Sequence, residues 1–136
     1  MKRKTQVTDI AKVETQKQAV NDVIAKYLLA VKTWDENSFR NTFHPKANIQ
    51  HYYVKGDEIK TITLDEFVAS IGSLHAKFAN AEEKAREIEI HIVDYLASVR
   101  VAFSFVMGER TMDGQDLFNL AFCKGEWKII HKSYYL

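Results

Sequence analysis

Two polar side chains, Asp116 and His131, interrupt an apolar stretch that covers residues 116–135. A carboxylate beside an imidazole can orient the ring, and the imidazole can then move a proton near neutral pH. The same two residues can also form a buried polar contact without chemistry, because buried polar groups need hydrogen-bond partners in any case. Asp116 and His131 are therefore the candidate catalytic pair, with a purely structural contact as the alternative.

The placement of this pair depends on the hairpin that carries it. Lys124-Gly125 fits a two-residue turn, in which the glycine supplies a positive φ. This turn predicts four opposite pairs on one face: Phe122 with Trp127, Leu120 with Ile129, Phe118 with His131, and Asp116 with Ser133. A three-residue turn would instead place Asn119 beside His131. We expect the two-residue turn, which directs Asp116 and His131 into the interior.

Aromatic residues supply the candidate walls of a ligand pocket. His51 and Tyr53 share one face of a predicted strand, where they form either the pocket mouth or a cross-strand aromatic patch. Tyr27 and Trp34 lie a helical distance apart, as ligand walls or as plain core. The predicted ligand-contacting residues are Tyr27, Trp34, His51, Tyr53, Phe105 and Phe118. Their chemistry favours a small hydrophobic or aromatic ligand.

Other kinds of site find little support in the sequence. No two histidines have HxH or HxxxH spacing, so no metal site is predicted. The chain shows neither a glycine-rich phosphate loop nor a nucleophile elbow, and no cofactor is predicted. Lys and Arg total 19 against 18 for Asp and Glu, which disfavours a nucleic-acid partner. One cysteine, no signal-peptide pattern and no long apolar run favour the cytoplasm and no membrane partner.

Helices are expected early in the chain and strands late. Apolar spacing predicts helices over residues 14–34, directly after Asp35, and from Thr63 to about residue 78. Capping boxes are predicted for Thr15 with Gln18 and for Thr63 with Glu66, and Pro45 is predicted to end the short helix. Strands are predicted over residues 47–54, 58–62, 86–94 and 97–107, and in the final hairpin.

This order predicts an α+β fold, with helices on one face of a curved, mainly antiparallel sheet. Residues 1–13 are predicted to form a flexible arm and residues 14–136 a single domain. A turn at Tyr95-Leu96 would place Ile90 opposite Val101. Residues 108–115 are predicted to be a longer connection, and the charged segment 82–89 a solvated edge.

Three short segments carry a resemblance to a known superfamily: Phe43-His44-Pro45, the stretch from Gly56 to Thr63, and Gly125-Glu126-Trp127-Lys128-Ile129-Ile130. In their order and spacing they resemble the nuclear transport factor 2-like superfamily, and most closely its putative lumazine-binding or SnoaL-like branch. The resemblance covers about residues 14–135. It implies a cone-shaped α+β barrel, built on a long N-terminal helix and shorter helices, with a pocket between helices and sheet. It also implies that His44 is structural.

The superfamily includes ketosteroid isomerase, scytalone dehydratase, limonene epoxide hydrolase and polyketide cyclases, and also modules without activity. Many members are homodimers through the outer sheet face. The isomerase's residues do not carry over, because the sequence around Tyr27 and Asp116 does not match. The acid–base Asp and nearby His of the cyclases are nearest in type to Asp116 and His131. Fold alone does not decide function.

Three functions therefore stay open. The first is a small-molecule binding protein with an internal pocket for an aromatic or polycyclic, apolar ligand. The second is a cofactor-free isomerase, cyclase or dehydratase that uses Asp116 and His131. The third is a dimerisation module, with Ala102, Val106, Ile130 and Tyr134 on the outward sheet face. A homodimer is compatible with all three.

Overall fold

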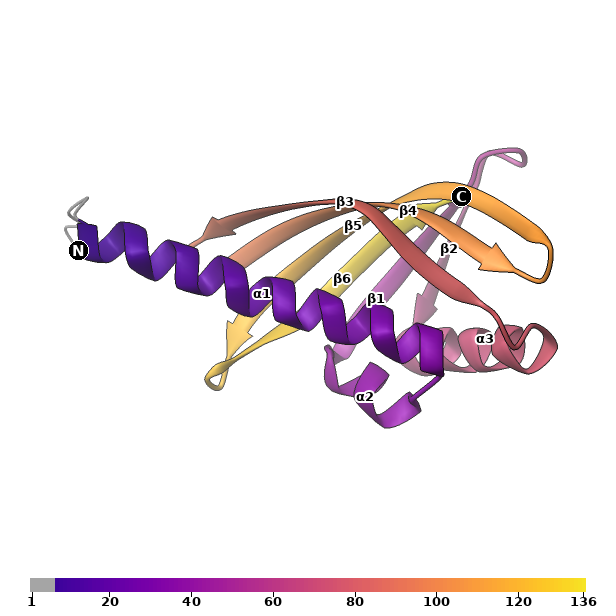
Figure 1. The fold of residues 1–136 in the computed structure, drawn as a ribbon, viewed down its shortest axis with the longest axis horizontal. Helices are drawn as coiled ribbons and strands as arrows, with labels where there is room; N and C mark the ends of the chain where they lie inside the picture. Colours follow the sequence, from indigo (N-terminus) through magenta and orange to yellow (C-terminus); the bar gives the residue numbers. More distant parts are fainter. Residues whose placement is uncertain (1–6) are drawn as a thin grey trace.

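The computed structural model describes residues 7–136, with side chains from residue 12 onward, as three helices and one six-stranded sheet. The helices are α1 (Val7–Thr33), α2 (Glu36–Asn41) and α3 (Leu64–Lys77). The strands are β1 (Phe43–Tyr53), β2 (Glu58–Thr63), β3 (Glu82–Val93), β4 (Leu96–Met107), β5 (Arg110–Cys123) and β6 (Glu126–Tyr135). Helix α1 runs along one side of the curved sheet, and α2 and α3 lie near the C-terminal end of α1 (Figure 1). The predicted α+β architecture is confirmed.

Helix α1 begins at Val7, earlier than predicted. Thr15 therefore lies inside the helix, and the capping box predicted for Thr15 and Gln18 is wrong. Of the arm predicted over residues 1–13, residues 1–6 lie outside the described part of the chain, and the rest is helical. One face of α1 is buried through residues spaced three or four apart: Val20, Ile24, Tyr27 and Val31.

The short helix and α3 start as the sequence predicts. The Asp35 carboxylate accepts hydrogen bonds from the Ser38 backbone N–H (3.1 Å) and hydroxyl (2.8 Å). Thr63 and Glu66 form a complete capping box. Pro45, however, lies inside β1 and does not end α2, which was the prediction. The helix ends at Asn41 with Thr42 as its C-cap, and the Thr42 carbonyl accepts a hydrogen bond from the Ile129 N–H of β6.

The strand order is β2-β1-β6-β5-β4-β3, and β1 pairs with β6 in parallel while the other neighbours are antiparallel. The β3–β4 turn is shifted from the predicted position, so Ile90 lies opposite Val99 and not opposite Val101. A shift of two residues keeps the same side chains on the same face. Residues 110–115 are strand, not the predicted connection, because Gly108, with φ of 63°, allows a tight turn before Arg110.

The final hairpin follows the predicted register only as far as Leu120. The Lys124-Gly125 turn is confirmed, with Phe122 opposite Trp127 and Leu120 opposite Ile129. The register then shifts, so that Ile130 is an extra residue and Asn119 lies opposite His131. This β-bulge reverses the faces of all later residues of β6. The predicted pairs of Phe118 with His131 and of Asp116 with Ser133 are wrong: Lys132 lies opposite Phe118, and Tyr134 opposite Asp116.

Gly114 marks a close approach between β5 and the C-terminus. A Cβ at this position would collide with the backbone carbonyl oxygen of Tyr135 and lie 2.6 Å from Cζ of Phe103. We expect Gly114→Ala to lower the free energy of unfolding by about 1–3 kcal/mol, because a packed neighbour must move. Urea denaturation measures the loss. Gly56→Ala is the matched control, since no atom lies within 4 Å of its added Cβ; equal losses in the two variants would contradict the expectation.

Candidate functional site

Four ionisable side chains meet inside the cone and form what we call the polar cluster: Tyr27, Glu83, Asp116 and Lys132. Their exposed fractions are 1%, 5%, 0% and 2%, respectively. They come from α1, β3, β5 and β6, so the cluster exists only in the folded chain. Among the described side chains, the one other buried polar group is Thr42. Charged residues are rarely buried so completely unless they are paired.

Hydrogen bonds and one ion pair connect the polar cluster. Lys132 Nζ lies 3.0 Å from Oδ1 of Asp116, and the Tyr27 hydroxyl donates to Oε1 of Glu83 at 2.8 Å. Apart from this ammonium, no hydrogen-bond donor within the described structure reaches either Asp116 oxygen or Oε2 of Glu83. The negative charges of the Glu83 and Asp116 carboxylates also oppose each other within the polar cluster. Two like charges in one buried site favour a proton on one of them.

Glu83 is the group that holds this proton. Burial, and after it the negative charge of Asp116, raise the pKa of the Glu83 carboxyl well above its usual range. Burial and the neighbouring Glu83 likewise raise the pKa of Tyr27 well above its usual range. The raised pKa favours a neutral Glu83 carboxylic acid beside the ion pair of Asp116 and Lys132. Such a set can bind a polar group, and it can also deliver and take up protons.

The raised pKa of Glu83 makes stability depend on pH. Between the ordinary glutamate pKa of about 4.3 and the raised value, the folded chain holds one proton more than the unfolded chain. Stability therefore falls as the pH rises through this window, by about 1.4 kcal/mol per pH unit. We expect Glu83→Gln to remove this slope, so that wild type loses stability relative to the variant as the pH rises above about 4.3.

Urea unfolding at several pH values measures this difference. The effect of histidine titration on stability cancels in the comparison, because wild type and Glu83→Gln contain the same histidines. Glu58→Gln, at an exposed position of β2, is the control and should follow the wild-type slope. Parallel pH profiles for wild type and Glu83→Gln would show that Glu83 does not hold an extra proton in the folded state.

Aromatic rings surround the ammonium of Lys132. Its Nζ lies 3.8 Å from the ring centre of Tyr134, 5.0 Å from that of Phe67 and 5.7 Å from that of Phe118. Ring faces attract a cation at such distances. His51 stacks on Tyr134 (ring centres 4.2 Å apart) and contacts Tyr53 (3.9 Å). Because Tyr53 is 41% exposed, these three rings, which we call the aromatic row, connect the polar cluster with the surface.

His51 is a histidine whose pKa is affected by the charge of the polar cluster. Its pKa is lowered by partial burial and, after that, by the positive charge of Lys132. The imidazole is therefore neutral at neutral pH and can pack as a flat ring. The aromatic row is thus apolar in character at the pH of most cells.

The structure brings most of the predicted site residues together. Tyr27 belongs to the polar cluster, Phe118 packs on its ring (5.2 Å between centres), and Phe105 lies opposite Glu83 in the sheet. His51 and Tyr53 form the aromatic row. Trp34 makes different contacts: it follows the end of α1 and packs on Phe39 and Gly72.

His131 does not meet Asp116, and the predicted catalytic pair is not formed. The bulge at Ile130 turns His131 to the outer face, where Nδ1 hydrogen-bonds with Oδ1 of Asn48. Lys132 takes the predicted inward place beside Asp116. The same bulge turns Tyr134 inward, so it is not part of the outward face on which it was predicted to lie.

Sequence reasoning also missed Glu83. The segment 82–89 was predicted to be a solvated edge, but Glu83 points inward and binds Tyr27. Ile88 faces inward, and the register of β3 shifts once between Ala85 and Glu87. Counted back across this shift, the alternation of the strand places Glu83 on the inward face, where the buried Tyr27 of α1 is its partner.

Two hollows lie away from the polar cluster. One, of about 580 Å³, lies between β1, β2 and the start of α3 and includes Asn48, Thr61 and Thr63. The other, of about 310 Å³, lies on β3, β4 and β5 and includes Ser98, Arg100 and Asn119. The predicted internal pocket is not present as an open cavity at either place. Core side chains and the aromatic row fill the space around the polar cluster.

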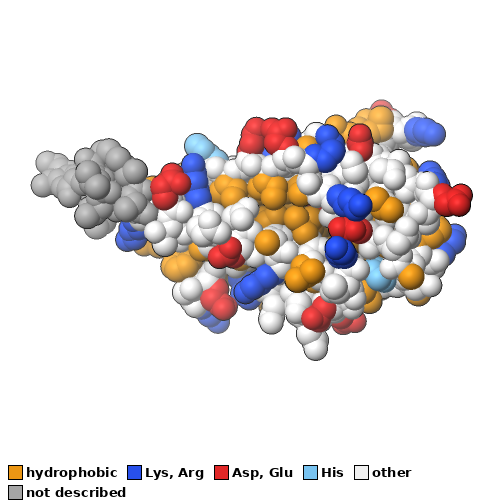
Figure 2. All heavy atoms as spheres, viewed as in Figure 1, with side chains coloured by type: hydrophobic (Ala, Val, Ile, Leu, Met, Phe, Trp, Pro, Cys, Tyr) orange, Lys and Arg blue, Asp and Glu red, His pale blue; other side chains and the backbone are white. Residues whose placement is uncertain are grey.

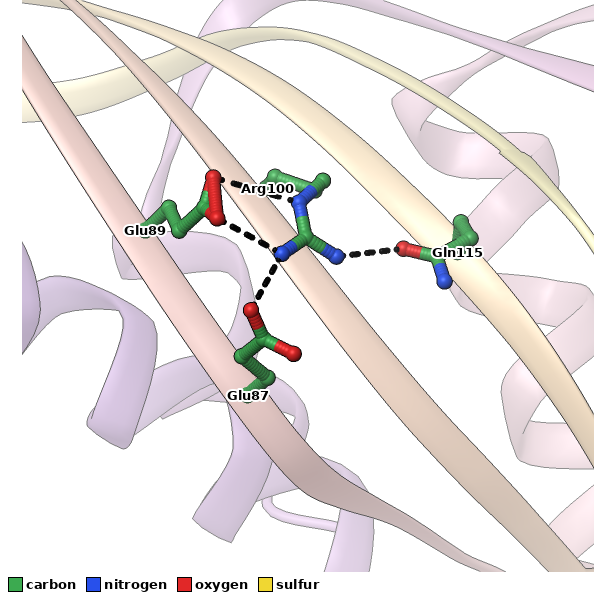
Figure 3. A network of polar contacts seen from close by, with 4 residues as sticks. All are labelled: Glu87, Glu89, Arg100 and Gln115. Carbon is green, nitrogen blue, oxygen red and sulfur yellow. Dashed lines mark hydrogen bonds and ion pairs between the residues drawn. The ribbon is translucent and has the colours of Figure 1, made fainter.

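Arg100 lies on the outer sheet face, where it meets polar residues of the two neighbouring strands. Its guanidinium donates to Glu87 (2.6 Å), Glu89 (2.8 Å) and Gln115 (3.1 Å), as Figure 3 shows. These exposed contacts are satisfied among themselves and take no part in the polar cluster. On the face drawn in Figure 2, acidic and basic side chains are interspersed around a central apolar area, without a large patch of one charge. No helix in residues 7–136 is long and apolar enough to cross a membrane.

A curved sheet packed on a long N-terminal helix, with polar residues inside, defines the nuclear transport factor 2-like class. The chain belongs to the family described as putative lumazine-binding, whose model matches residues 15–135. Both the predicted superfamily and its lumazine-binding branch are thereby confirmed. Among proteins with curated functions, no sequence matches this chain.

Solved structures show the same fold. An NTF2-like protein of unknown function from Shewanella baltica is 23% identical, with a TM-score of 0.69, over 97% of this chain and 96% of that one. A protein described as a putative scytalone dehydratase, from Novosphingobium aromaticivorans, is 17% identical (TM-score 0.74; 94% and 87% covered). A putative ketosteroid isomerase from Shewanella frigidimarina is 18% identical (TM-score 0.67; 85% and 94% covered). At these identities the likeness establishes the fold alone.

Proposed function

We propose that this protein binds a small, flat, aromatic or polycyclic molecule inside the cone, with Asp116 and Lys132 at the polar end of the site. The observation that carries the proposal is the burial of the polar cluster among aromatic rings. Burying an ion pair costs free energy that a core of packed apolar side chains would avoid. Apolar walls with a few convergent polar groups are the usual composition of small-molecule sites.

The polar cluster also favours a particular ligand edge. The Asp116 oxygens can accept hydrogen bonds, and the ammonium of Lys132 has donors beyond its one ion pair. A ring N–H or O–H beside a carbonyl complements this arrangement. Pteridine-2,4-dione, or lumazine, has such an edge, and the description of the family supports this choice of probe.

Ligand entry requires the aromatic row to move. Tyr134 is half-buried and stacks on His51, so rotation of these two rings would open a path from the exposed Tyr53 to Lys132. The rings would then stack on the ligand in place of each other, which preserves most of their contact energy.

A thermal-shift experiment with lumazine, 2-naphthol and the non-planar 1-adamantanol tests the proposal. A ligand at one hundred times its dissociation constant adds about 2.7 kcal/mol to the free energy of unfolding. We expect lumazine or 2-naphthol to raise the melting temperature by several degrees and 1-adamantanol to have no effect. If neither flat compound stabilises the protein, the proposal fails.

A second candidate function is acid–base catalysis by the polar cluster. It is favoured by one observation: Glu83, whose pKa is raised by burial and by the charge of Asp116, lies in the same buried cluster as the ion pair of Asp116 and Lys132. Such a pair could move a proton next to a ligand carbonyl. Deuterium incorporation from D₂O into a cyclic ketone, followed by mass spectrometry, would reveal this activity. It should disappear in Glu83→Gln and be unchanged in His131→Ala. A homodimer stays a prediction, which sedimentation at micromolar concentration would test.

A further inference from the structure

Lys132 is the one buried lysine among the side chains that the structure describes. Its amine lies inside the cone with a carboxylate oxygen 3.0 Å away and four rings within 5.8 Å, those of Tyr27, Phe67, Phe118 and Tyr134. The bulge at Ile130 is what places it there, because without that extra residue Lys132 would face outward. An ion pair needed only for stability could be supplied at much lower cost at the surface.

Three features of this environment suit a covalent reaction of the amine with a carbonyl group. Enclosure protects an imine from hydrolysis by bulk water. Asp116 can take one proton from the ammonium, which frees the nitrogen lone pair. The rings and Asp116 stabilise a positive charge at this position, and the product iminium carries the same charge as the starting ammonium.

We propose that Lys132 forms a Schiff base with a small aromatic aldehyde or ketone that enters the cone. The inference rests on the proposed function, since the carbonyl compound must first occupy the ligand site. Asp116 accepts a proton from Nζ, and the nitrogen then bonds to the carbonyl carbon to give a carbinolamine. The Glu83 carboxylic acid donates its proton to the carbinolamine oxygen, the C–O bond breaks and water leaves. Ammonium plus carbonyl thus becomes iminium plus water.

A proton transfer from Asp116 to Glu83 completes this sequence. After the C–O bond breaks, Asp116 carries the proton taken from Lys132, and Glu83 has lost its own. The released water can carry this proton from Asp116 to Glu83, because both carboxyl groups lie in the buried polar cluster, and the transfer restores a neutral Glu83 and a charged Asp116. Asp116 then becomes the counter-ion of the iminium. Lys132 is the reacting residue in this scheme, and Asp116 and Glu83 are the proton carriers.

Reductive trapping tests the inference. The protein is incubated with 2-naphthaldehyde and sodium cyanoborohydride, and proteolytic peptides are analysed by mass spectrometry. We expect Lys132 to carry the naphthylmethyl group at least tenfold more often than exposed lysines such as Lys124. Lys124→Arg should leave the trapping at Lys132 unchanged. Lys132→Arg keeps the positive charge but cannot form the imine, so labelling at position 132 should be absent and only the surface lysines should be modified.

The variant Asp116→Asn removes the proton acceptor and should slow trapping at Lys132 at least tenfold. Labelling of surface lysines with none at Lys132 would overturn the inference. A parallel thermal shift with 2-naphthol, which lacks a carbonyl, separates the two levels of the proposal. Stabilisation by 2-naphthol without trapping refutes only the Schiff base. Absence of trapping, together with no stabilisation by 2-naphthol or lumazine, refutes the ligand site as well.

Discussion

Lys132→Met is expected to lower the free energy of unfolding by about 3–5 kcal/mol. The substitution keeps the volume of the chain in the aromatic cage but leaves Asp116, which has no exposed surface, without its ion-pair partner. Folded domains are stable by only about 5–15 kcal/mol, so the loss should be visible directly in urea unfolding at pH 7.

The double variant Asp116→Leu/Lys132→Met is the control for this result. Removal of both charges leaves an apolar contact of similar size, and such replacements are often neutral or stabilising. We therefore expect the double variant to be near wild type in stability, and the coupling between the two positions to be large. A loss below about 1 kcal/mol in Lys132→Met would show that the buried ion pair is not formed.

Phe118→Ala is expected to cost about 3–5 kcal/mol, through lost burial and the cavity that remains. The ring of Phe118 is 1% exposed and packs between Tyr27 and the Lys132 ammonium. Phe122, four residues along the same strand and on the same face, is 37% exposed and supplies the matched control. Phe122→Ala should cost less than about 2 kcal/mol by the same urea measurement. Equal losses would contradict the placement of Phe118 in the core.

The elements of the fold were predictable because their signals are local. Capping boxes, alternation and helical spacing depend on residues within one or two turns, and the caps at Asp35 and Thr63 form as expected. The β3–β4 turn was misplaced by one residue, yet Ile88, Ile90 and Ile92 all pack against the core, as the alternation of the strand requires. An even change in register preserves faces, so the pattern of burial survives such an error.

The bulge at Ile130 was not predictable from alternation. In an ideal strand, residues 127, 129 and 131 would share one face and residues 128, 130 and 132 the other. Neither set contains a glycine or proline that would indicate a bulge. The register is decided by the sheet, where β6 must pair in parallel with β1 and antiparallel with β5. His131 and Lys132 are both polar, and only the tertiary position of Asp116 determines which one is inward.

The burial of aromatic residues around the candidate site could be predicted from the sequence, whereas its polar centre could not. Tyr27, Phe118, His51 and Tyr53 lie in or beside the predicted interior because aromatic burial follows from periodicity. Glu83 and Lys132 were missed because an isolated charged residue in a sequence is usually exposed. Burial of Glu83 depends on Tyr27, which is 56 residues away in the chain.

The most direct test of the ligand site is a fluorescence titration of lumazine with three proteins: wild type, His131→Ala and Asp116→Leu/Lys132→Met. The double variant keeps the fold but lacks the polar end of the site, and His131→Ala changes only the outer face. We predict that His131→Ala binds lumazine within about twofold of wild type and that the double variant binds at least tenfold more weakly, a difference of about 1.4 kcal/mol or more. Unchanged binding by the double variant, or loss of binding in His131→Ala, would contradict a site built on Asp116 and Lys132.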